Sequence, residues 1–118
     1  MSITRMDTGP RLSRAVIHND TIYLAGLIAD EGHQEGIAEQ TRNVLEKIDI
    51  LLERAGSDKM HILRAALFIK DMKYLDEMNE LWLEWIPEGH APARAAVEAN
   101  LAHPHLLIEI VITAAVKE

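Results

Sequence analysis

The segment LLIEIVITAAV (residues 106–116) reads as a β-strand that is apolar on both of its faces. Successive side chains of a strand point to opposite faces of the sheet. A strand with one face in water therefore alternates apolar and polar residues, whereas a strand buried on both faces does not. Glu109 is the one charged residue that interrupts this segment. We expect the strand in the interior of a sheet that is covered on both sides.

Two segments closer to the N-terminus have the spacing of amphipathic helices. Apolar residues fall on one helical stripe over residues 37–55, and again over residues 71–86. Gly56 suits the C-terminal cap of the first helix, and Asp71 is placed to cap the start of the second. Pro87 follows the second helix and ends it. Each helix is expected to bury one side against a sheet.

The other apolar segments read as strands. Residues 15–26 predict two strands joined by a tight turn at Asn19–Asp20, since both residues tolerate the backbone conformation of such turns. Residues 27–36 are polar, contain two glycines and read as a loop. Further strands are expected at residues 2–7, 60–70, 92–101 and 106–116. The expected order along the chain is β, β, β, α, β, α, β, β.

These elements predict an α+β sandwich, in which both helices cover one face of a mixed, mainly antiparallel sheet. A chain of 118 residues fits one domain, residues 1–118. The second face of the sheet would be open in a monomer, yet the strand at 106–116 is apolar on that side too. We therefore expect a homo-oligomer.

Composition narrows the classes of function. The formal net charge is -7 and the cations occur singly, so strong nucleic-acid binding is disfavoured. The chain has no cysteine, and hence no disulfide and no thiolate nucleophile. It lacks a run of about eighteen apolar residues that would predict a membrane span, and its N-terminal segment does not resemble a signal peptide. We expect a cytoplasmic protein without a nucleic-acid or membrane partner.

The segment HAPARAAVEAN (residues 90–100) carries an arginine among small apolar residues. Strand alternation places Arg94 and Ala96 on one face, and Ala93 and Ala95 on the other. Small neighbours leave space beside the guanidinium, whose parallel N–H groups match the two oxygens of a carboxylate. Arg94 is therefore a candidate receptor for an anionic ligand.

Glu109 is the second candidate site residue. An ionised carboxylate among apolar residues costs several kcal/mol unless it is paired or protonated. A carboxylate in such surroundings suits general acid–base chemistry. Two other interpretations stay open: Arg94 and Glu109 form a structural ion pair with each other, or each faces solvent at an edge of the sheet.

Other chemically suggestive residues have simpler interpretations. The six histidines lack the spacing of metal-binding motifs, so no metal site is expected. Trp82 and Trp85 fall on the helical stripe and are expected to pack in the core instead of stacking on a ligand.

Several segments resemble the RidA family, also called YjgF and often described as endoribonuclease L-PSP. The C-terminal signature of that family resembles PARAAVEANL together with the glutamate of IEI. Its N-terminal hairpin resembles SRAVIHNDTIYLAG, its first helix resembles EQTRNVLEKIDILLERAGS, and its next strand and helix resemble ILRAALFIKDMKYLDEMNELW. The segment WLEWIPEGHAPAR resembles a small branch of the family, typified by YoaB.

This resemblance implies a chorismate-mutase-like α+β fold. In the family, three subunits pack their sheets into a central β-barrel, with clefts between neighbouring subunits. Family members with the matching arginine hydrolyse 2-imino and 2-enamino acids to 2-oxo acids and ammonia, without a cofactor or a metal. The resemblance therefore implies a homotrimeric, cofactor-independent imine deaminase.

The resemblance also implies roles for individual residues. Arg94 matches the arginine that holds the substrate carboxylate, Glu109 the glutamate that positions or activates water, and Gly26 the glycine whose backbone lines the cleft. Three further substrate-binding positions depart from the family pattern, in which a tyrosine, a serine and a cysteine are replaced here by Leu12, Ala25 and Ala96. Two alternative functions stay open: a non-catalytic trimer that binds or senses a 2-oxo acid, and an endoribonuclease.

Overall fold

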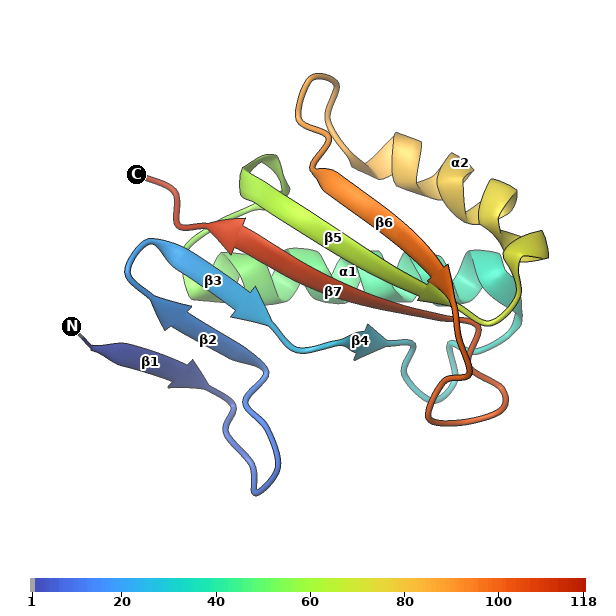
Figure 1. The fold of residues 1–118 in the computed structure, drawn as a ribbon, viewed down its shortest axis with the longest axis horizontal. Coiled ribbons are helices and arrows are strands. Elements are labelled where there is room, and N and C mark those ends of the chain that lie inside the picture. Colours follow the sequence, from blue (N-terminus) through green and yellow to red (C-terminus); the bar gives the residue numbers. More distant parts are fainter. Residues whose placement is uncertain (1) are drawn as a thin grey trace.

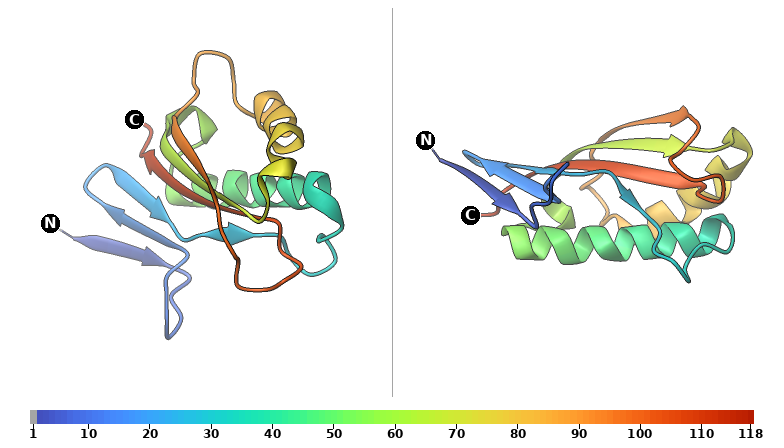
Figure 2. Two further views of the ribbon diagram at one scale, coloured as in Figure 1. Left: turned by 45° about the vertical axis from the view of Figure 1, so that its right-hand side comes forward. Right: turned by 90° about the horizontal axis from the view of Figure 1, so that it is seen from below.

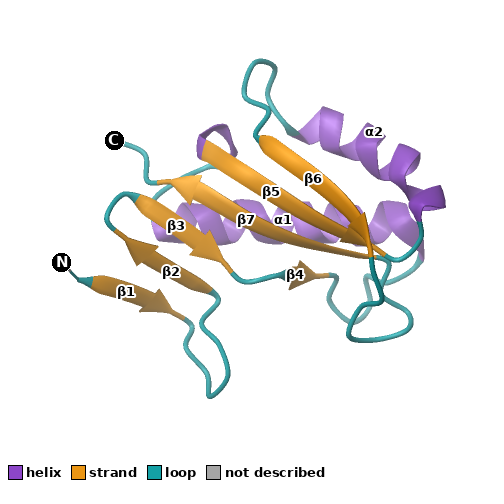
Figure 3. Ribbon diagram, viewed as in Figure 1, coloured by secondary structure: helices purple, strands orange, loops and turns teal. Residues whose placement is uncertain are grey.

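Seven strands and two α-helices make up the computed structural model, which describes residues 2–118 (Figures 1 and 3). The helices are α1 (Gly36–Ala55) and α2 (Leu75–Trp85), each preceded or followed by a short 3-10 turn, η1 (Lys59–His61) after α1 and η2 (Met72–Tyr74) before α2. The strands are β1 (Ile3–Met6), β2 (Ala15–His18), β3 (Thr21–Leu24), β4 (Leu27–Ile28), β5 (Ile62–Ile69), β6 (Ala93–Glu98) and β7 (Ile108–Ala115).

The strands form one mixed sheet in the order β1-β2-β3-β7-β5-β6, with the short β4 beside β7. All neighbours are antiparallel except β5 and β6, which are parallel because α2 connects them as a crossover. Both helices lie on the same side of the sheet, as the view from below shows (Figure 2). This arrangement confirms the predicted α+β class with two helices on one face. Neither helix is long and apolar enough to span a membrane.

Strand β7 lies in the middle of the sheet, between β5 on one side and β3 and β4 on the other. One of its faces is completely buried against the helices, through Ile108, Ile110, Ile112 and Ala114. The opposite face is half-buried and carries Glu109, Val111, Thr113 and Ala115. The prediction of an interior strand is confirmed, and its second face is partly covered within one chain.

The helix boundaries follow from their capping residues. Gly56 ends α1 in the left-handed conformation (φ 94°), which costs glycine little, and its N–H donates to the carbonyls of the last turn. Asp71 accepts a hydrogen bond from the Lys73 N–H (2.9 Å) but starts η2, so the predicted helix over 71–86 was too long at its N-terminal end. Helix α2 proper begins at Leu75.

Two strand predictions also need correction. The predicted loop at 27–36 contains β4, because Leu27 is buried and pairs with Ile110 of β7. The predicted strand at 60–70 begins two residues later, at Ile62, since Asp58 first caps η1 by accepting from the Met60 N–H at 3.0 Å. The hairpin between β2 and β3 is confirmed, with Asn19 in the left-handed region at φ 57°.

A buried glutamine connects α1 to the start of β7. The Gln40 side chain donates to the carbonyls of Gln34 (2.9 Å) and His105 (3.0 Å). Its Oε1 accepts from the Leu107 N–H at 2.8 Å. Because these bonds satisfy a fully buried amide, they hold the loop before β7, and with it Glu109 two residues later, in one position.

The face of the sheet opposite the helices is uncovered in a single chain. Apolar side chains occupy it, half-buried at Ala66, Phe68 and Val111 and about half exposed at Tyr23 and Val97 (both 49%). We call this surface the open sheet face.

Candidate functional site

Arg94 lies on β6, which forms one edge of the sheet. In the register of β5 and β6, Arg94 is beside Ala65 and Ala96 is beside Leu67. Ala65 and Leu67 are fully buried under the helices, so Arg94 and Ala96 point to the helix side of the sheet. There the guanidinium carbon of Arg94 lies 5.3 Å from the ring centroid of Trp82 on α2.

The Arg94 guanidinium is exposed and has no acidic partner among the described residues, 2–118. The ion pairs within residues 2–118 are His33–Glu39, Lys47–Asp30, Arg54–Asp7, His61–Asp58 and Lys117–Asp58. Five surface hollows of 200 to 440 Å³ in the single chain are lined by other residues. The N–H groups of Arg94 are therefore available to an anion from outside the chain.

Glu109 lies on β7, in the middle of the open sheet face. Its register neighbours are Ile28 on β4 and Phe68 on β5, and its side chain is half-buried. The carboxylate rests directly over Gly26: a Cβ on Gly26 would overlap Glu109 Oε2 and lie 2.9 Å from Cδ. The absence of a side chain at residue 26 is thus what makes room for the Glu109 carboxylate.

Arg94 and Glu109 point to opposite sides of the same sheet. Arg94 shares the helix side with Ala65, whereas Glu109 shares the open sheet face with Phe68. The interpretation of these two residues as an ion pair with each other is therefore wrong within one chain. Within the described chain, the two residues therefore do not face a common site.

The other three predicted site residues are spread over the molecule. Leu12 is 57% exposed on the loop that projects between β1 and β2, at the far edge of the sheet from β6 (Figure 1). Ala25 is half-buried between β3 and β4 and donates its N–H to the Arg14 carbonyl at 2.9 Å. Ala96 packs against the edge of the core. One chain brings together Gly26, Ala25 and Glu109, and separately Arg94 and Ala96.

The resolved pKa shifts belong to surface ion pairs away from these residues. The side-chain hydrogen bond from His61 (2.7 Å) lowers the pKa of Asp58. Hydrogen bonds from Lys47 and from Arg54 lower the pKa values of Asp30 and Asp7 in the same way. These carboxylates hold loops and helix ends in place.

The described residues, 2–118, contain no group of three or more histidine and acidic side chains arranged to hold a metal ion. His103 and His105 stack on each other in the loop before β7, with ring centroids 5.5 Å apart and planes at 11°.

The contact between Trp82 and Arg94 was missed from the sequence. Trp82 is 5% exposed, so the expectation that it packs in the core is confirmed. The contact of Trp82 with Arg94 depends on β6 lying parallel to β5 with α2 alongside, and no local sequence pattern predicts that arrangement.

The described residues form a mixed sheet backed by two helices, with an unpaired arginine on the edge strand and a glutamate over a glycine at the centre of the sheet. These features define the class of YjgF-like α+β proteins. The family model for endoribonuclease L-PSP matches residues 2–116, and the chain belongs to this family, which also goes by the names YjgF and RidA.

Relatives of known sequence and structure match the chain over nearly its whole length. A RutC family protein of Haemophilus influenzae is 44% identical over 114 residues, covering 97% of this chain and 98% of the relative. The RutC family protein YoaB of Escherichia coli is 43% identical over 116 residues, covering 98% of this chain and 100% of the relative. The crystal structure of a YjgF family member from Neisseria meningitidis superposes with a TM-score of 0.95 at 44% identity, covering 100% of this chain and 98% of that one.

Proposed function

We propose that this protein hydrolyses 2-imino and 2-enamino acids to 2-oxo acids and ammonia. The observation that carries the proposal is the unpaired Arg94 guanidinium, which no acidic side chain of residues 2–118 neutralises. Membership of the family supports the same chemistry. The reaction needs no cofactor, because a protonated imine carbon is already an electrophile.

Arg94 binds the substrate carboxylate in this proposal. Its neighbours Ala93, Ala95 and Ala96 are small, so a planar carboxylate can approach the guanidinium edge and accept two parallel hydrogen bonds. Such bidentate binding fixes the direction of the adjacent C=N bond and presents its carbon to water.

Glu109 orients the attacking water and accepts its proton. The water oxygen forms a bond to the iminium carbon, and the C=N double bond becomes a C–N single bond. The resulting carbinolamine takes that proton from Glu109 on its nitrogen. Its hydroxyl group then returns a proton to Glu109 as a new C=O bond forms and the C–N bond breaks, which releases ammonia. Water and imine are thereby converted to 2-oxo acid and ammonia without any oxidant or reductant.

The complete site lies between two copies of the chain. Arg94 of one copy and Glu109 of its neighbour supply the two roles, because one chain holds these residues on opposite sides of its sheet. The apolar open sheet face gives the copies a surface to bury, and the resemblance to the family favours a trimer with a central barrel. The exposed Leu12 on its projecting loop then becomes a contact to a neighbouring copy.

Arg94→Ala tests the proposal. We expect kcat/KM for a freshly generated 2-imino acid to fall by about a hundredfold or more, because the carboxylate loses a bidentate, charge-assisted anchor. The imine is generated in the cuvette by an amino-acid oxidase, and its decay is followed with and without the protein. Arg42→Ala is the matched control, since Arg42 is an exposed arginine on another element, α1, and lies outside the ion pairs of residues 2–118.

Equal rates for the wild type and Arg94→Ala would contradict the proposal. Loss of activity in Arg42→Ala as well would also contradict it, because a site at Arg94 does not involve that residue.

Binding of a 2-oxo acid without turnover is the second candidate function. It is favoured by Leu12, Ala25 and Ala96, which give the site no polar side chain beyond Arg94 and Glu109. Calorimetric titration with 2-oxobutyrate beside the imine assay distinguishes the two: heat of binding that depends on Arg94, without imine decay, supports the binding function. Ribonuclease activity is disfavoured by the net charge of -7.

A further inference from the structure

Trp82 forms the floor beneath Arg94. The guanidinium carbon lies 5.3 Å from the Trp82 ring centroid, within the range of a cation–π interaction. Trp82 belongs to α2 and is almost fully buried, whereas Arg94 is exposed on β6. An exposed arginine on an edge strand is therefore held from below by a side chain of the core.

The two interactions of a guanidinium use different parts of it. An aromatic ring contacts the flat face, and a carboxylate binds in the plane, along the N–H edge. We infer that Trp82 is a positioning residue for Arg94: it stacks on one face of the guanidinium and leaves the N–H edge free for the ligand. We call Arg94, in its role of binding the substrate carboxylate, the carboxylate clamp. This inference rests on the proposed function, in which Arg94 binds the carboxylate of the substrate.

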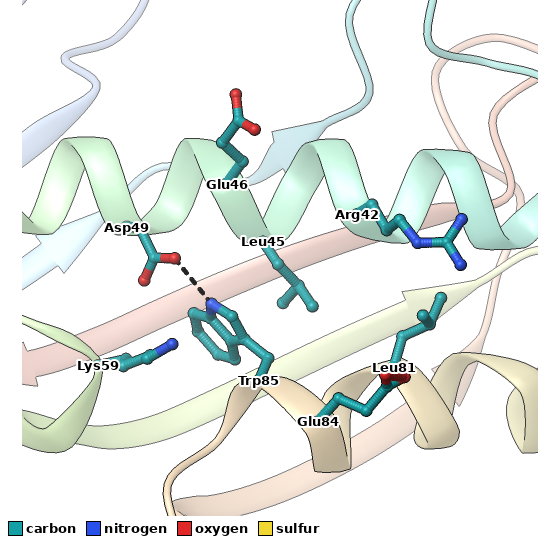
Figure 4. A pocket seen from close by; sticks show the side chains of 8 residues that line it. All are labelled: Arg42, Leu45, Glu46, Asp49, Lys59, Leu81, Glu84 and Trp85. Carbon is teal, nitrogen blue, oxygen red and sulfur yellow. Dashed lines mark hydrogen bonds between the residues drawn. The ribbon is translucent and has the colours of Figure 1, made fainter.

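Trp82 is itself fixed by a second tryptophan. The ring centroids of Trp82 and Trp85 are 5.3 Å apart, with planes at 54°. Trp85 donates its indole N–H to Asp49 Oδ2 of α1 at 2.9 Å, as the dashed line in Figure 4 shows. Lys59 lies 5.5 Å from the centroid of the Trp85 ring. The contacts from Asp49 to Trp85 and from Trp85 to Trp82 thus connect α1 to Arg94. They limit the orientations that the Trp82 ring can adopt.

Holding Arg94 before the ligand arrives improves binding in two ways. A flexible arginine loses rotamer freedom when it grips a carboxylate, and stacking on Trp82 removes part of that loss in advance. The stacking also keeps the guanidinium plane at one angle, so its N–H edge meets the ligand in a constant geometry. The effect is expected on affinity and KM more than on kcat.

Trp82→Leu and Trp82→Phe form the test pair. Both remove the indole and leave a smaller apolar side chain, but Phe keeps an aromatic face under Arg94. We expect Trp82→Leu to weaken 2-oxobutyrate binding and raise KM about tenfold, and Trp82→Phe to stay within about threefold of the wild type. Calorimetry gives the affinity, the imine assay gives KM and kcat, and thermal unfolding shows whether the two variants are equally folded.

The outcomes separate this inference from the proposed function. If the wild type binds 2-oxobutyrate no better than Arg94→Ala does, the proposed function fails and the clamp with it. If binding depends on Arg94 but Trp82→Leu and Trp82→Phe bind equally well, the clamp stands and the role of Trp82 is overturned.

A fluorescence measurement keeps the inference testable if Trp82→Leu does not fold. Trp82 and Trp85 are the two tryptophans of the chain, so Trp85→Phe leaves Trp82 as the sole indole. We expect a further Arg94→Ala substitution to shift the emission of Trp82, because it removes a cation from the ring face. We also expect 2-oxobutyrate to change that emission in Trp85→Phe and not in the double variant. Identical emission in both proteins would overturn the inference.

Discussion

Among single residues, the contact between Gly26 and Glu109 shows how the backbone makes room for a carboxylate. Gly26 has an ordinary negative φ or an extended backbone, so its missing side chain is not required by conformation. It is required by space, because a Cβ would overlap the Glu109 carboxylate. Gly26 therefore sets where that carboxylate lies.

Gly26→Ala is expected to displace Glu109 and lower kcat by about a hundredfold, the usual cost of misplacing a reacting group by roughly 1 Å. Unfolding stability should change by less than about 1 kcal/mol, because the atoms in the way belong to the end of a flexible side chain. Kinetics and thermal unfolding are measured for Gly26→Ala, Glu109→Ala and the double variant. Since Gly26 acts through Glu109, the double variant should be no slower than Glu109→Ala alone.

An additive loss in the double variant would show that Gly26 acts independently of Glu109, and would contradict this account of the residue.

The sequence identified both charged candidates, for a physical reason. Arg94 and Glu109 interrupt apolar strand patterns, and a charge in such a pattern needs an explanation. Their relation to each other stayed open, because alternation gives the faces of one strand and not which faces of two strands coincide. The contacts of Gly26 with Glu109 and of Trp82 with Arg94 could not be predicted from the sequence either, since each depends on the packing of distant segments.

At the scale of elements, the junction between α1 and β5 depends on one carboxylate. Asp58 accepts from the Met60 N–H and from His61 Nδ1, and Lys117 Nζ lies 3.7 Å from its other oxygen. The hydrogen bond from His61 is the largest cause of the lowered pKa of Asp58. The charged form of Asp58 is therefore favoured in the folded protein.

The pH dependence of stability follows from that lowered pKa. In the unfolded chain Asp58 takes up a proton near its ordinary pKa of 3.8, whereas the folded protein resists protonation to lower pH. The stabilisation is thus fully present above that value and is lost as the pH falls through the folded pKa. We expect Asp58→Asn to lower Tm at pH 7 by roughly 1–3 °C, since partly solvated pairs contribute little, and to narrow the gap to wild type at pH 3.

Asp20→Asn is the matched control for this measurement, because Asp20 is an exposed turn residue outside the ion pairs of residues 2–118. A constant Tm difference between wild type and Asp58→Asn from pH 7 to pH 3 would contradict the assigned linkage.

Periodicity predicted both helices and most strands, because each buries a continuous stripe that repeats in the sequence. It failed for β4, whose two residues are too few to show a period and pair only because β7 lies beside them. It also could not order the strands, since the neighbours of β7 come from both ends of the chain.

For the whole molecule, a single chain holds the two candidate site residues, Arg94 and Glu109, on opposite sides of one sheet. The open sheet face exposes apolar side chains such as Tyr23 and Val97, and the loop with Leu12 projects beyond the sheet. The apolar pattern of β7 predicted that this face would be covered. We propose that an assembly of copies covers this surface and brings Arg94 of one copy close to Glu109 of the next.

Complementation between two inactive variants tests whether Arg94 and Glu109 of different copies form one site. Arg94→Ala retains Glu109, and Glu109→Gln retains Arg94. The two chains, carrying different affinity tags, are refolded together, and mixed oligomers are purified through both tags in succession. Light scattering on each parent and on the mixture checks that the mass is three times the 13.3 kDa of one chain.

Mixed oligomers are expected to regain imine hydrolysis at about one site in three, where an intact Glu109 from one chain meets an intact Arg94 from the next in a cyclic trimer. Mixed oligomers that form fully and remain as inactive as their parents would contradict it.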